Sequence, residues 1–371
     1  MIRILHSVSN MDRAGIETML MNYYRNIDKN RMQFDFLCNK TKPGAYDNEI
    51  ISMGGKIYHT PGLNPAKYPQ YLSYMQALFQ KHPEYRIIHA HNGAFGVYAL
   101  HAAKKDGIPV RIFHGHDAKL AFDIKWPLRI FCRSRLPYNC NYHCACGIDA
   151  ARCYYGDAVI DRGDYKLIHN AIDVNRFRYN EEIRNSLRSM YHLEKKTVIG
   201  HIARFTKQKN HTFLIDIFQK IHEQDTNTVL VLLGEGDLME KMKKKIKNCG
   251  IEDSVMIMGN VANANEWYQA FDAFVLPSLW EGLPVVGIES QMASLPCIFS
   301  DTVTAETKIS DKVTFLSLKQ KPEVWASTIL SKIKENKRTD MEKVITKAGY
   351  NIAVEAAKLQ SFYERLTEEH K

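Results

Sequence analysis

The chain has 371 residues, 45% of them hydrophobic and 25% charged, with a formal net charge of +9 at pH 7. This composition is typical of a folded globular protein, and disorder is not expected except at the last few residues. The length exceeds what one core usually accommodates, so two domains are expected.

The first half of the chain alternates short apolar runs with helical patterns. The runs read IRILHSV, FDFLCN, IIHAH and VRIFHGH, and the helical patterns include IETMLMNYYRNI and YLSYMQALFQKH. This alternation predicts a parallel sheet with helices on both faces. No secretion signal precedes the first run, and no run approaches the roughly 20 apolar residues that span a bilayer, so we expect a cytoplasmic protein.

Two loops of this half follow predicted strands and carry candidate site residues. In SNMDRAGIETML, Gly15 opens a helix at the first turn, which in a doubly wound domain approaches phosphates or a second substrate. In FHGHD, His114 and His116 lie at a strand end, where ligands of parallel sheets bind. Alternating histidines serve as metal ligands, catalytic bases or polar contacts, whereas a single histidine is most often structural.

The excess of positive charge lies mainly in the first half. There the segment Lys125–Tyr138, KWPLRIFCRSRLPY, interleaves four cations with Trp126, Phe131 and Tyr138. Cations that meet lipid headgroups and aromatic rings that lie at the interface suit an anionic membrane surface, which predicts a peripheral membrane contact. A solvated basic face is the alternative. No nucleic-acid motif accompanies the segment, so no nucleic-acid partner is predicted.

Five of the eight cysteines crowd the stretch FCRSRLPYNCNYHCACGIDAARCYYG. A zinc site here would draw its four ligands from Cys140, Cys144, Cys146, Cys153 and His143. The spacing lacks the usual pair of C-x-x-C hooks, so free cytosolic thiols are the favoured interpretation and no metal site is predicted.

The second half repeats the alternation after a polar stretch, EEIRNSLRSMYHLEKK. Its apolar runs include TVIGHIAR, TVLVLLG, VMIMG and AFVLP, which predicts a second Rossmann-like domain. The expected organisation is a first domain over 1–174, a linker over 175–194 and a second domain over 195–345. A helical pattern over 346–371 could pack back on the first domain.

Two strand ends of the second half carry charged candidates. In GHIARFTKQKN, Arg204 and Lys209 lie between a strand and a helix, and fixed positive charge beside a helix N-terminus suits a diphosphate. A surface pair of cations is the alternative. The run LLGEGDLME has no third glycine in register, so a turn before a helix explains it better than dinucleotide binding.

The run WEGLPVVGIES places a glycine and a proline after the strand AFVLP. Gly282 lets backbone amides approach a ligand, and Pro284 presets the first turn of a helix. Glu281 precedes that helix and Glu289 lies inside it, so the two acids should contact different parts of one extended ligand. Carboxylates accept hydrogen bonds from hydroxyl groups of a sugar or a ribose, although solvated helix charges are the common alternative.

Taken together and in this order, these motifs resemble those of the retaining family 4 glycosyltransferases. The resemblance runs over nearly the whole chain and is greatest to enzymes that build bacterial exopolysaccharide or capsule repeat units. It implies an α/β architecture of the GT-B type, with two Rossmann-like domains facing across a cleft. The segment PSLWEG followed by the second glutamate is its most specific part.

The resemblance also implies roles for particular residues. Arg204 and Lys209 would hold the donor diphosphate, Glu289 the ribose hydroxyls, and Glu281 the donor sugar. His114 would contact the transferred sugar, with His116 beside it, and Gly15 would lie near phosphate and acceptor. Backbone groups near sugar, phosphate or base would come from Gly282, Leu283, Val285, Val286 and the segment Gly259–Val261, which includes Val261.

Three positions depart from the family pattern. Ala14 stands where a second glycine is frequent, Ala171 replaces the glycine of N-G-[IV]-D, and Ser294 replaces a glycine before Leu295. These changes affect loop geometry, most of all at Ala14, but they remove no charged group.

The predicted reaction is transfer of a hexose or N-acetylhexosamine from a nucleotide sugar, which we expect to be UDP-linked, to a growing lipid-linked glycan. The anomeric configuration would be retained, and fixed protein charge would replace a metal ion, so no cofactor is expected. We expect the protein in the cytoplasm, with peripheral attachment to the inner face of the plasma membrane as an option. The alternatives are a nucleotide-sugar epimerase of similar fold and a non-catalytic partner subunit; a nicotinamide oxidoreductase is more distant.

Overall fold

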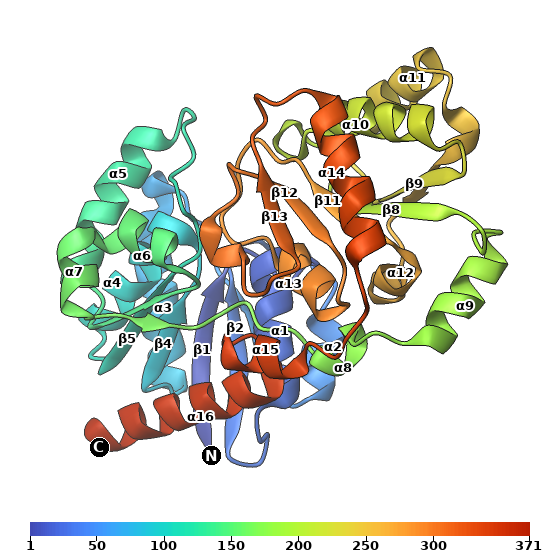
Figure 1. Ribbon diagram of the computed structural model, residues 1–371. Helices are drawn as coiled ribbons and strands as arrows, with labels where there is room; N and C mark the ends of the chain where they lie inside the picture. Colours follow the sequence, from blue (N-terminus) through green and yellow to red (C-terminus); the bar gives the residue numbers. More distant parts are fainter. The chain divides into compact units, whose positions relative to one another are not determined.

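The computed structural model describes residues 1–371, apart from the side chain of Pro65. The chain forms two compact units: unit 1 comprises Met1–Ala171 and Ile352–Lys371, and unit 2 comprises Ile172–Asn351. Each unit contains one sheet whose strands are all parallel, with helices between successive strands (Figure 1). The predicted α/β fold with two Rossmann-like domains is thus confirmed.

Unit 1 contains a seven-stranded sheet in the order β3-β2-β1-β4-β5-β6-β7. Its strands are β1 (Ile2–Val8), β2 (Met32–Cys38), β3 (Ile57–His59), β4 (Ile87–Ala90), β5 (Val110–Gly115), β6 (Tyr142–Ala145) and β7 (Lys166–Leu167). The strand order reverses between β1 and β4, which are neighbours in space but not in sequence. Ligands of open parallel sheets bind at such a reversal, outside the carboxyl ends of the strands.

Helices cover both faces of this sheet because alternate residues of each strand point to opposite faces. The helices are α1 (Gly15–Asn26), α2 (Asp47–Ser52), α3 (Tyr68–Lys81), α4 (Val97–Lys105), α5 (Trp126–Arg135), α6 (Ile148–Tyr155), α7 (Asp157–Arg162) and α16 (Ile352–Glu369), with single 3₁₀ turns η1 (Pro65–Lys67), η2 (Gly93–Gly96) and η3 (Leu136–Tyr138). Ile4 of β1 faces a core that includes residues of α1 and α16, whereas Leu5 faces a core that includes residues of α3 and α4.

Unit 2 contains a six-stranded sheet in the order β10-β9-β8-β11-β12-β13, which reverses between β8 and β11. Its strands are β8 (Thr197–Ile202), β9 (Thr228–Leu233), β10 (Val255–Gly259), β11 (Ala273–Leu276), β12 (Cys297–Ser300) and β13 (Val313–Leu316). Its helices are α8 (Val174–Phe177), α9 (Glu181–Met190), α10 (His211–Gln224), α11 (Met239–Asn248), α12 (Ala264–Ala270), α13 (Val285–Met292), α14 (Pro322–Glu335) and α15 (Glu342–Lys347), with 3₁₀ turns η4 (Lys207–Lys209), η5 (Glu252–Ser254) and η6 (Ala305–Thr307).

The segment 175–194, expected to be a linker, lies in unit 2 and contains most of α8 and all of α9. Leu187 of α9 is buried, and Arg184 and Arg188 both bind the carboxylate of Asp272, at 2.5 and 3.1 Å. Asp272 also accepts the backbone N–H of Val198 at 2.8 Å. The segment reads as polar because much of α9 is exposed, but these contacts attach it to the sheet.

The C-terminal helix α16 returns to unit 1, as Figure 1 shows in red. Leu359, Tyr363 and Leu366 lie in the core beneath β1 and β4, and α16 packs beside α1. After α15 the chain passes from unit 2 back to unit 1 at the junction of Asn351 and Ile352.

Candidate functional site

Three of the four charged residues predicted for unit 2 lie in the loops that leave the two central strands, β8 and β11. Arg204 and Lys209 follow β8, and Glu281 follows β11. Because the strand order reverses between these two strands, both loops emerge at the position where parallel sheets bind ligands. The three residues thus follow strands, as the sequence predicted, and the strand order brings their loops to one edge of the sheet.

Lys209 and Glu281 form an ion pair, with Lys209 Nζ 2.5 Å from Glu281 Oε1. The Lys209 side chain is 17% exposed and that of Glu281 is 7% exposed, so water screens this pair weakly. Glu281 also accepts hydrogen bonds from Ser278 Oγ at 2.8 Å and from Gln208 Nε2 at 3.1 Å. The carboxylate is thus held by three donors from two loops.

Backbone contacts fix the two loops to each other. Leu279 donates its N–H to Gln208 O at 2.8 Å, and Asn210 Nδ2 donates to Pro277 O at 3.1 Å. Asn210 adopts φ +52, a left-handed conformation that asparagine tolerates better than most residues, and α10 begins directly after it. The positions of Lys209 and Glu281 are consequently set by the backbone as well as by their own charges.

Arg204 is exposed, and its side chain makes no hydrogen bond or ion pair with the described residues. Its backbone, in contrast, is tightly held, because Phe205 donates its N–H to Glu235 O at 2.9 Å. At Gly236, with φ +157, an added Cβ would lie 2.6 Å from Phe205 O, so only glycine allows the loop after β9 to pack here. The run LLGEGDL is therefore a turn, as predicted, and it supports the Arg204 loop.

Helix α13 begins at Val285, directly after Pro284, as the sequence predicted. Among the described residues, the backbone N–H groups of Gly282, Leu283, Val285 and Val286 have no hydrogen-bond acceptor. Free amides at a helix N-terminus carry partial positive charge and bind anions. The start of α13 therefore offers an anion-binding surface beside Glu281.

Glu289 lies in α13 and is half-buried. Its Oε2 accepts a hydrogen bond from Tyr268 Oη of α12 at 2.7 Å. Burial raises the pKa of the Glu289 carboxyl to about 7, although the Tyr268 hydrogen bond and the positive charge of Arg176 oppose this rise. A carboxyl with this pKa exists in both protonation states near neutral pH.

The segment Gly259–Val261, predicted to contact a base, follows β10. Gly259 adopts φ +65, and its carbonyl accepts the N–H of Gly234 at 2.8 Å. Asn260 Nδ2 donates to Glu235 Oε2 at 3.1 Å, and Val261 is half-buried against the core. These contacts join the segment to the loop that supports Arg204.

The unit 1 candidates lie at the ends of β1 and β5. Gly15 begins α1, and a Cβ added there would have no heavy atom within 4 Å. His114 is fully buried, and burial together with neighbouring histidines holds its pKa well below the usual value. His116 is half-buried, and its Nε2 lies 3.0 Å from His91 Nδ1. Of the two predicted histidines, His116 thus has the more accessible ring within this unit.

The sequence-based prediction did not include four residues that lie at these edges: Gln208, Ser278, Tyr268 and His91. Gln208 is adjacent to Lys209, so the run TKQKN already contained it. His91 belongs to the run IIHAH, whose alternating histidines repeat the pattern seen in FHGH. Ser278 lies in the PSLWEG motif, three residues before Glu281. Tyr268 has no comparable signal, because it is identified only by its contact with Glu289.

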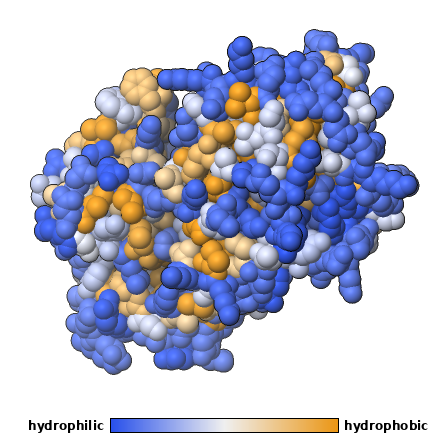
Figure 2. Space-filling view, in the orientation of Figure 1, coloured by the Kyte–Doolittle hydropathy of each residue, from blue (hydrophilic) through white to orange (hydrophobic). Residues whose placement is uncertain are grey.

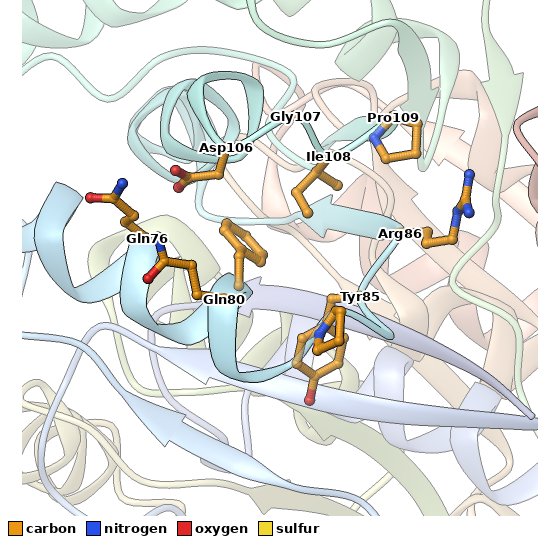
Figure 3. A pocket seen from close by; sticks show the side chains of 10 residues that line it. Gln76, Gln80, Tyr85, Arg86, Asp106, Gly107, Ile108 and Pro109 are labelled. Carbon is orange, nitrogen blue, oxygen red and sulfur yellow. The ribbon is translucent and has the colours of Figure 1, made fainter.

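A cavity of about 470 Å³ in unit 1 lies at the opposite edge of the sheet, where β4 and β5 begin (Figure 3). Gln76, Gln80 and Tyr85 line one side, and Asp106 and Ile108 line another. This cavity contains none of the predicted site residues.

The basic aromatic segment Lys125–Tyr138 forms α5 and the turn after it. Large apolar side chains are exposed before, in and just after this helix, and Figure 2 shows hydrophobic surface where Figure 1 places α5. The exposed side chains are Phe122, Ile124, Trp126, Ile130, Phe131 and Tyr138. Arg129 is paired with Asp123 at 2.5 Å, so it stabilises the loop before α5. In the described residues no helix has both the length and the apolar character required to cross a bilayer.

The cysteine cluster does not gather into a metal-ligand group among the described residues. Cys140 and Cys144 are buried, and burial raises the pKa of each thiol to about 12. None of the eight cysteines forms a disulfide in the described part of the chain.

Two sequence families match the chain. Residues 13–176 match the family described as "Glycosyltransferase Family 4", and residues 182–351 match "Glycosyl transferases group 1". The two matches lie almost entirely in unit 1 and unit 2, respectively.

The chain is similar to "Putative glycosyltransferase EpsF" of Bacillus subtilis strain 168, with 34% identity over 373 residues that cover 99% of this chain and 97% of that protein. The "UDP-Gal:alpha-D-GlcNAc-diphosphoundecaprenol alpha-1,3-galactosyltransferase" of Escherichia coli is 28% identical over 238 residues, covering 60% of this chain and 59% of that protein. The crystal structure of Anabaena HepE in complex with UDP-glucose superposes with a TM-score of 0.75 at 17% identity, covering 99% of this chain and 100% of HepE.

Proposed function

The chain belongs to the family 4 glycosyltransferases and has the GT-B fold, and from this premise we propose the reaction that it catalyses. It transfers a hexose or N-acetylhexosamine from a UDP-linked donor to a lipid-linked glycan of a growing surface polysaccharide. The named specificity of the Escherichia coli relative for a UDP-sugar and a diphosphoundecaprenol-linked acceptor supports this choice of donor and acceptor.

The observation that carries the proposal is the set of charged and amide groups at one edge of the unit 2 sheet. Arg204, the Lys209–Glu281 pair and the free amides that begin α13 lie in the loops after β8 and β11. Glu289 follows on the same helix. Cations and amides suit a diphosphate, and carboxylates suit hydroxyl groups, which together describe a sugar nucleotide.

Binding of the donor would exchange partners at the ion pair. A diphosphate that takes Lys209 Nζ releases one oxygen of Glu281, which then accepts a hydrogen bond from a sugar hydroxyl. Arg204, which has no partner among the described residues, binds the same diphosphate from the side of β8. Glu289 in its ionised form accepts hydrogen bonds from the ribose.

Cleavage of the sugar–phosphate bond leaves positive charge on the sugar and negative charge on the diphosphate. Arg204, Lys209 and the N-terminus of α13 stabilise that negative charge. In the proposed front-face step the acceptor oxygen bonds to the anomeric carbon on the side that the phosphate leaves, and the phosphate takes the acceptor's proton. The configuration is then retained without a carboxylate nucleophile, and the fixed protein charges require no metal ion.

Peripheral attachment to an anionic membrane would bring the enzyme to its lipid-linked acceptor. The exposed aromatic side chains around α5, with Lys125, Arg133 and Arg135, support this attachment. Replacing these three cations by glutamine should abolish binding to vesicles rich in phosphatidylglycerol. The matched control replaces Lys241, Lys244 and Lys247 of α11, which changes the charge equally and should leave binding intact.

The proposed reaction is tested with purified protein, several UDP- and GDP-sugars, and undecaprenyl-diphosphate-linked acceptors. We expect release of UDP only when both a UDP-sugar and a suitable acceptor are present, together with a glycolipid longer by one sugar. Conversion of the sugar nucleotide without acceptor would instead support the epimerase. Binding of the sugar nucleotide without any conversion would support the non-catalytic subunit.

A further inference from the structure

Five histidines gather at the carboxyl edge of the unit 1 sheet, on the strands β1, β4 and β5 or directly after β4 and β5. They are His6, His89, His91, His114 and His116. The strand register explains the cluster, because His6 pairs with His89 across β1 and β4, and His91 follows two residues later on the same face. This is the position at which the strand order of unit 1 reverses.

We propose that His6, His89 and His91, the histidine triad, bind a single divalent transition-metal ion. One ring nitrogen from each residue lies within 4.8 Å of the others, and all three side chains are buried. Tetrahedral or trigonal binding with bonds of about 2.0–2.1 Å requires nitrogens about 3.3–3.6 Å apart. His6 Nδ1 and His91 Nε2 are 3.0 Å apart, so this pair would separate by a few tenths of an ångström.

The hydrogen bonds around the triad leave a ring nitrogen available on each member. His89 Nδ1 lies 2.7 Å from Tyr363 Oη of α16, which leaves His89 Nε2, a buried atom with no partner among the described residues. His91 Nδ1 lies 3.0 Å from His116 Nε2, so His91 can carry its proton there and keep a lone pair on Nε2. His6 can likewise carry its proton on Nε2, which has no partner among the described residues either.

Each of the three rings can therefore direct the lone pair of one nitrogen toward a common ion and keep its proton on the other nitrogen. All three rings are buried, and burial favours the neutral form of each imidazole. Neutral imidazole is the form that binds metals. Without a cation, one proton lies between His6 Nδ1 and His91 Nε2, and His89 Nε2 stays unsatisfied, which is costly for a buried polar atom.

The ligand set selects the kind of ion. Three imidazoles suit Zn²⁺, Co²⁺, Ni²⁺ or Cu²⁺, whereas Mg²⁺ and Ca²⁺ prefer oxygen ligands. The contact of His89 with Tyr363 would act as an outer hydrogen bond that orients a metal-binding ring. With an ion on His91 Nε2, its Nδ1–H donates to His116, which fixes the tautomer of that half-buried ring. The ion would join β1 to β4 and is separate from the diphosphate chemistry proposed for unit 2.

The alternative is a chain of hydrogen-bonded histidines, His6–His91–His116, that holds no ion. The two cases are distinguished with the untagged full-length protein, stripped by a chelator, dialysed and titrated with Co²⁺. The proposal predicts one Co²⁺ per chain with the intense visible absorption of a four-coordinate site, and displacement of Co²⁺ by Zn²⁺. Absence of that absorption, or only the weak spectrum of a six-coordinate ion, would overturn it.

Substitutions locate the ion. His6→Gln and His89→Gln should each weaken Co²⁺ affinity at least tenfold, and Tyr363→Phe, which keeps the ring but removes the hydroxyl, should weaken it by about 10–100-fold. His143→Gln on β6 is the matched control and should bind as the unmodified protein does. Circular dichroism checks the fold of each variant. If a histidine variant unfolds, the Co²⁺ affinity of Tyr363→Phe decides the test. Unchanged affinity in His6→Gln, or loss only in His114→Gln, would refute the triad as the site.

Discussion

Lys209 Nζ and Glu281 Oε1 lie 2.5 Å apart at the reversal point of the unit 2 sheet. The two residues were predicted to hold different parts of one ligand, the diphosphate and the sugar. In the ligand-free protein they neutralise each other, so two charges that face a donor site are kept in position until the donor separates them. This arrangement supplies preorganised charge and limits the cost of leaving either group unpaired.

The first prediction separates the structural role of this pair from its role in transfer. Lys209→Met leaves the Glu281 carboxylate without its cation. This change should lower the free energy of unfolding by about 1–3 kcal/mol and the rate of sugar transfer at least a hundredfold. The double variant Lys209→Met/Glu281→Gln should recover stability in chemical denaturation but not activity. The control is Lys245→Met, which breaks the ion pair between Lys245 of α11 and Asp216 of α10. This variant should retain sugar transfer. Recovery of transfer in the double variant would show that the pair acts only through the fold.

The second prediction follows from the raised pKa of Glu289, about 7. The ribose requires the carboxylate, so UDP-glucose affinity should increase about tenfold from pH 6 to pH 8, as the ionised fraction rises. UDP-glucose is the suitable probe because its diphosphate stays fully ionised over this range. Isothermal titration calorimetry at several pH values measures the trend.

Two variants test the assignment to Glu289. Glu289→Gln should abolish the pH dependence, and Tyr268→Phe should move its midpoint to higher pH, because the Tyr268 hydrogen bond lowers the pKa of Glu289. The stability of the ligand-free protein should show the opposite trend. The folded state keeps a proton that the unfolded chain releases, so the free energy of unfolding falls as pH rises from about 4.5 to about 7. A pH dependence of binding that persists in Glu289→Gln would contradict the assignment.

The third prediction concerns Gly15, which the fold of unit 1 does not require. A Cβ there meets no heavy atom within 4 Å, so Gly15→Ala should leave the melting temperature unchanged or slightly higher. If its backbone approaches phosphate or acceptor, the added methyl group should still reduce transfer at least tenfold. Ala14→Gly is the control, because Ala14 has the extended φ of −128° that any residue adopts. Full transfer by Gly15→Ala would place the ligand elsewhere.

The sequence predicted those features that depend on local periodicity. Alternating apolar runs indicated both parallel sheets, and the position of a charged or glycine-rich loop after a run indicated the binding edge. Arg204, Lys209 and Glu281 could be assigned to one edge because parallel strands share their carboxyl ends. The sequence could not show that Lys209 and Glu281 contact each other, since this depends on which strands lie side by side.

Other features depended on contacts between distant residues. The segment 175–194 reads as a linker, but Arg184 and Arg188 bind Asp272, more than 80 residues away. Ser294 replaces a glycine of the family pattern and adopts φ +57, a conformation that costs energy in a residue with a Cβ. Its Oγ accepts the N–H of Thr339 at 3.0 Å, which offsets part of that cost and could not be read from the local sequence.

The central claim is that the edge of unit 2 binds the diphosphate of a nucleotide sugar, and Arg204 tests it most directly. Arg204 is exposed and has no partner among the described residues, so Arg204→Ala should change the free energy of unfolding by less than about 0.5 kcal/mol. The dissociation constant for UDP should rise about 10–100-fold, whereas Lys207→Ala in the same loop should change it little. The decisive measurement is UDP binding by Arg204→Ala. A large loss of affinity in a fully folded variant supports the account, and unchanged affinity contradicts it.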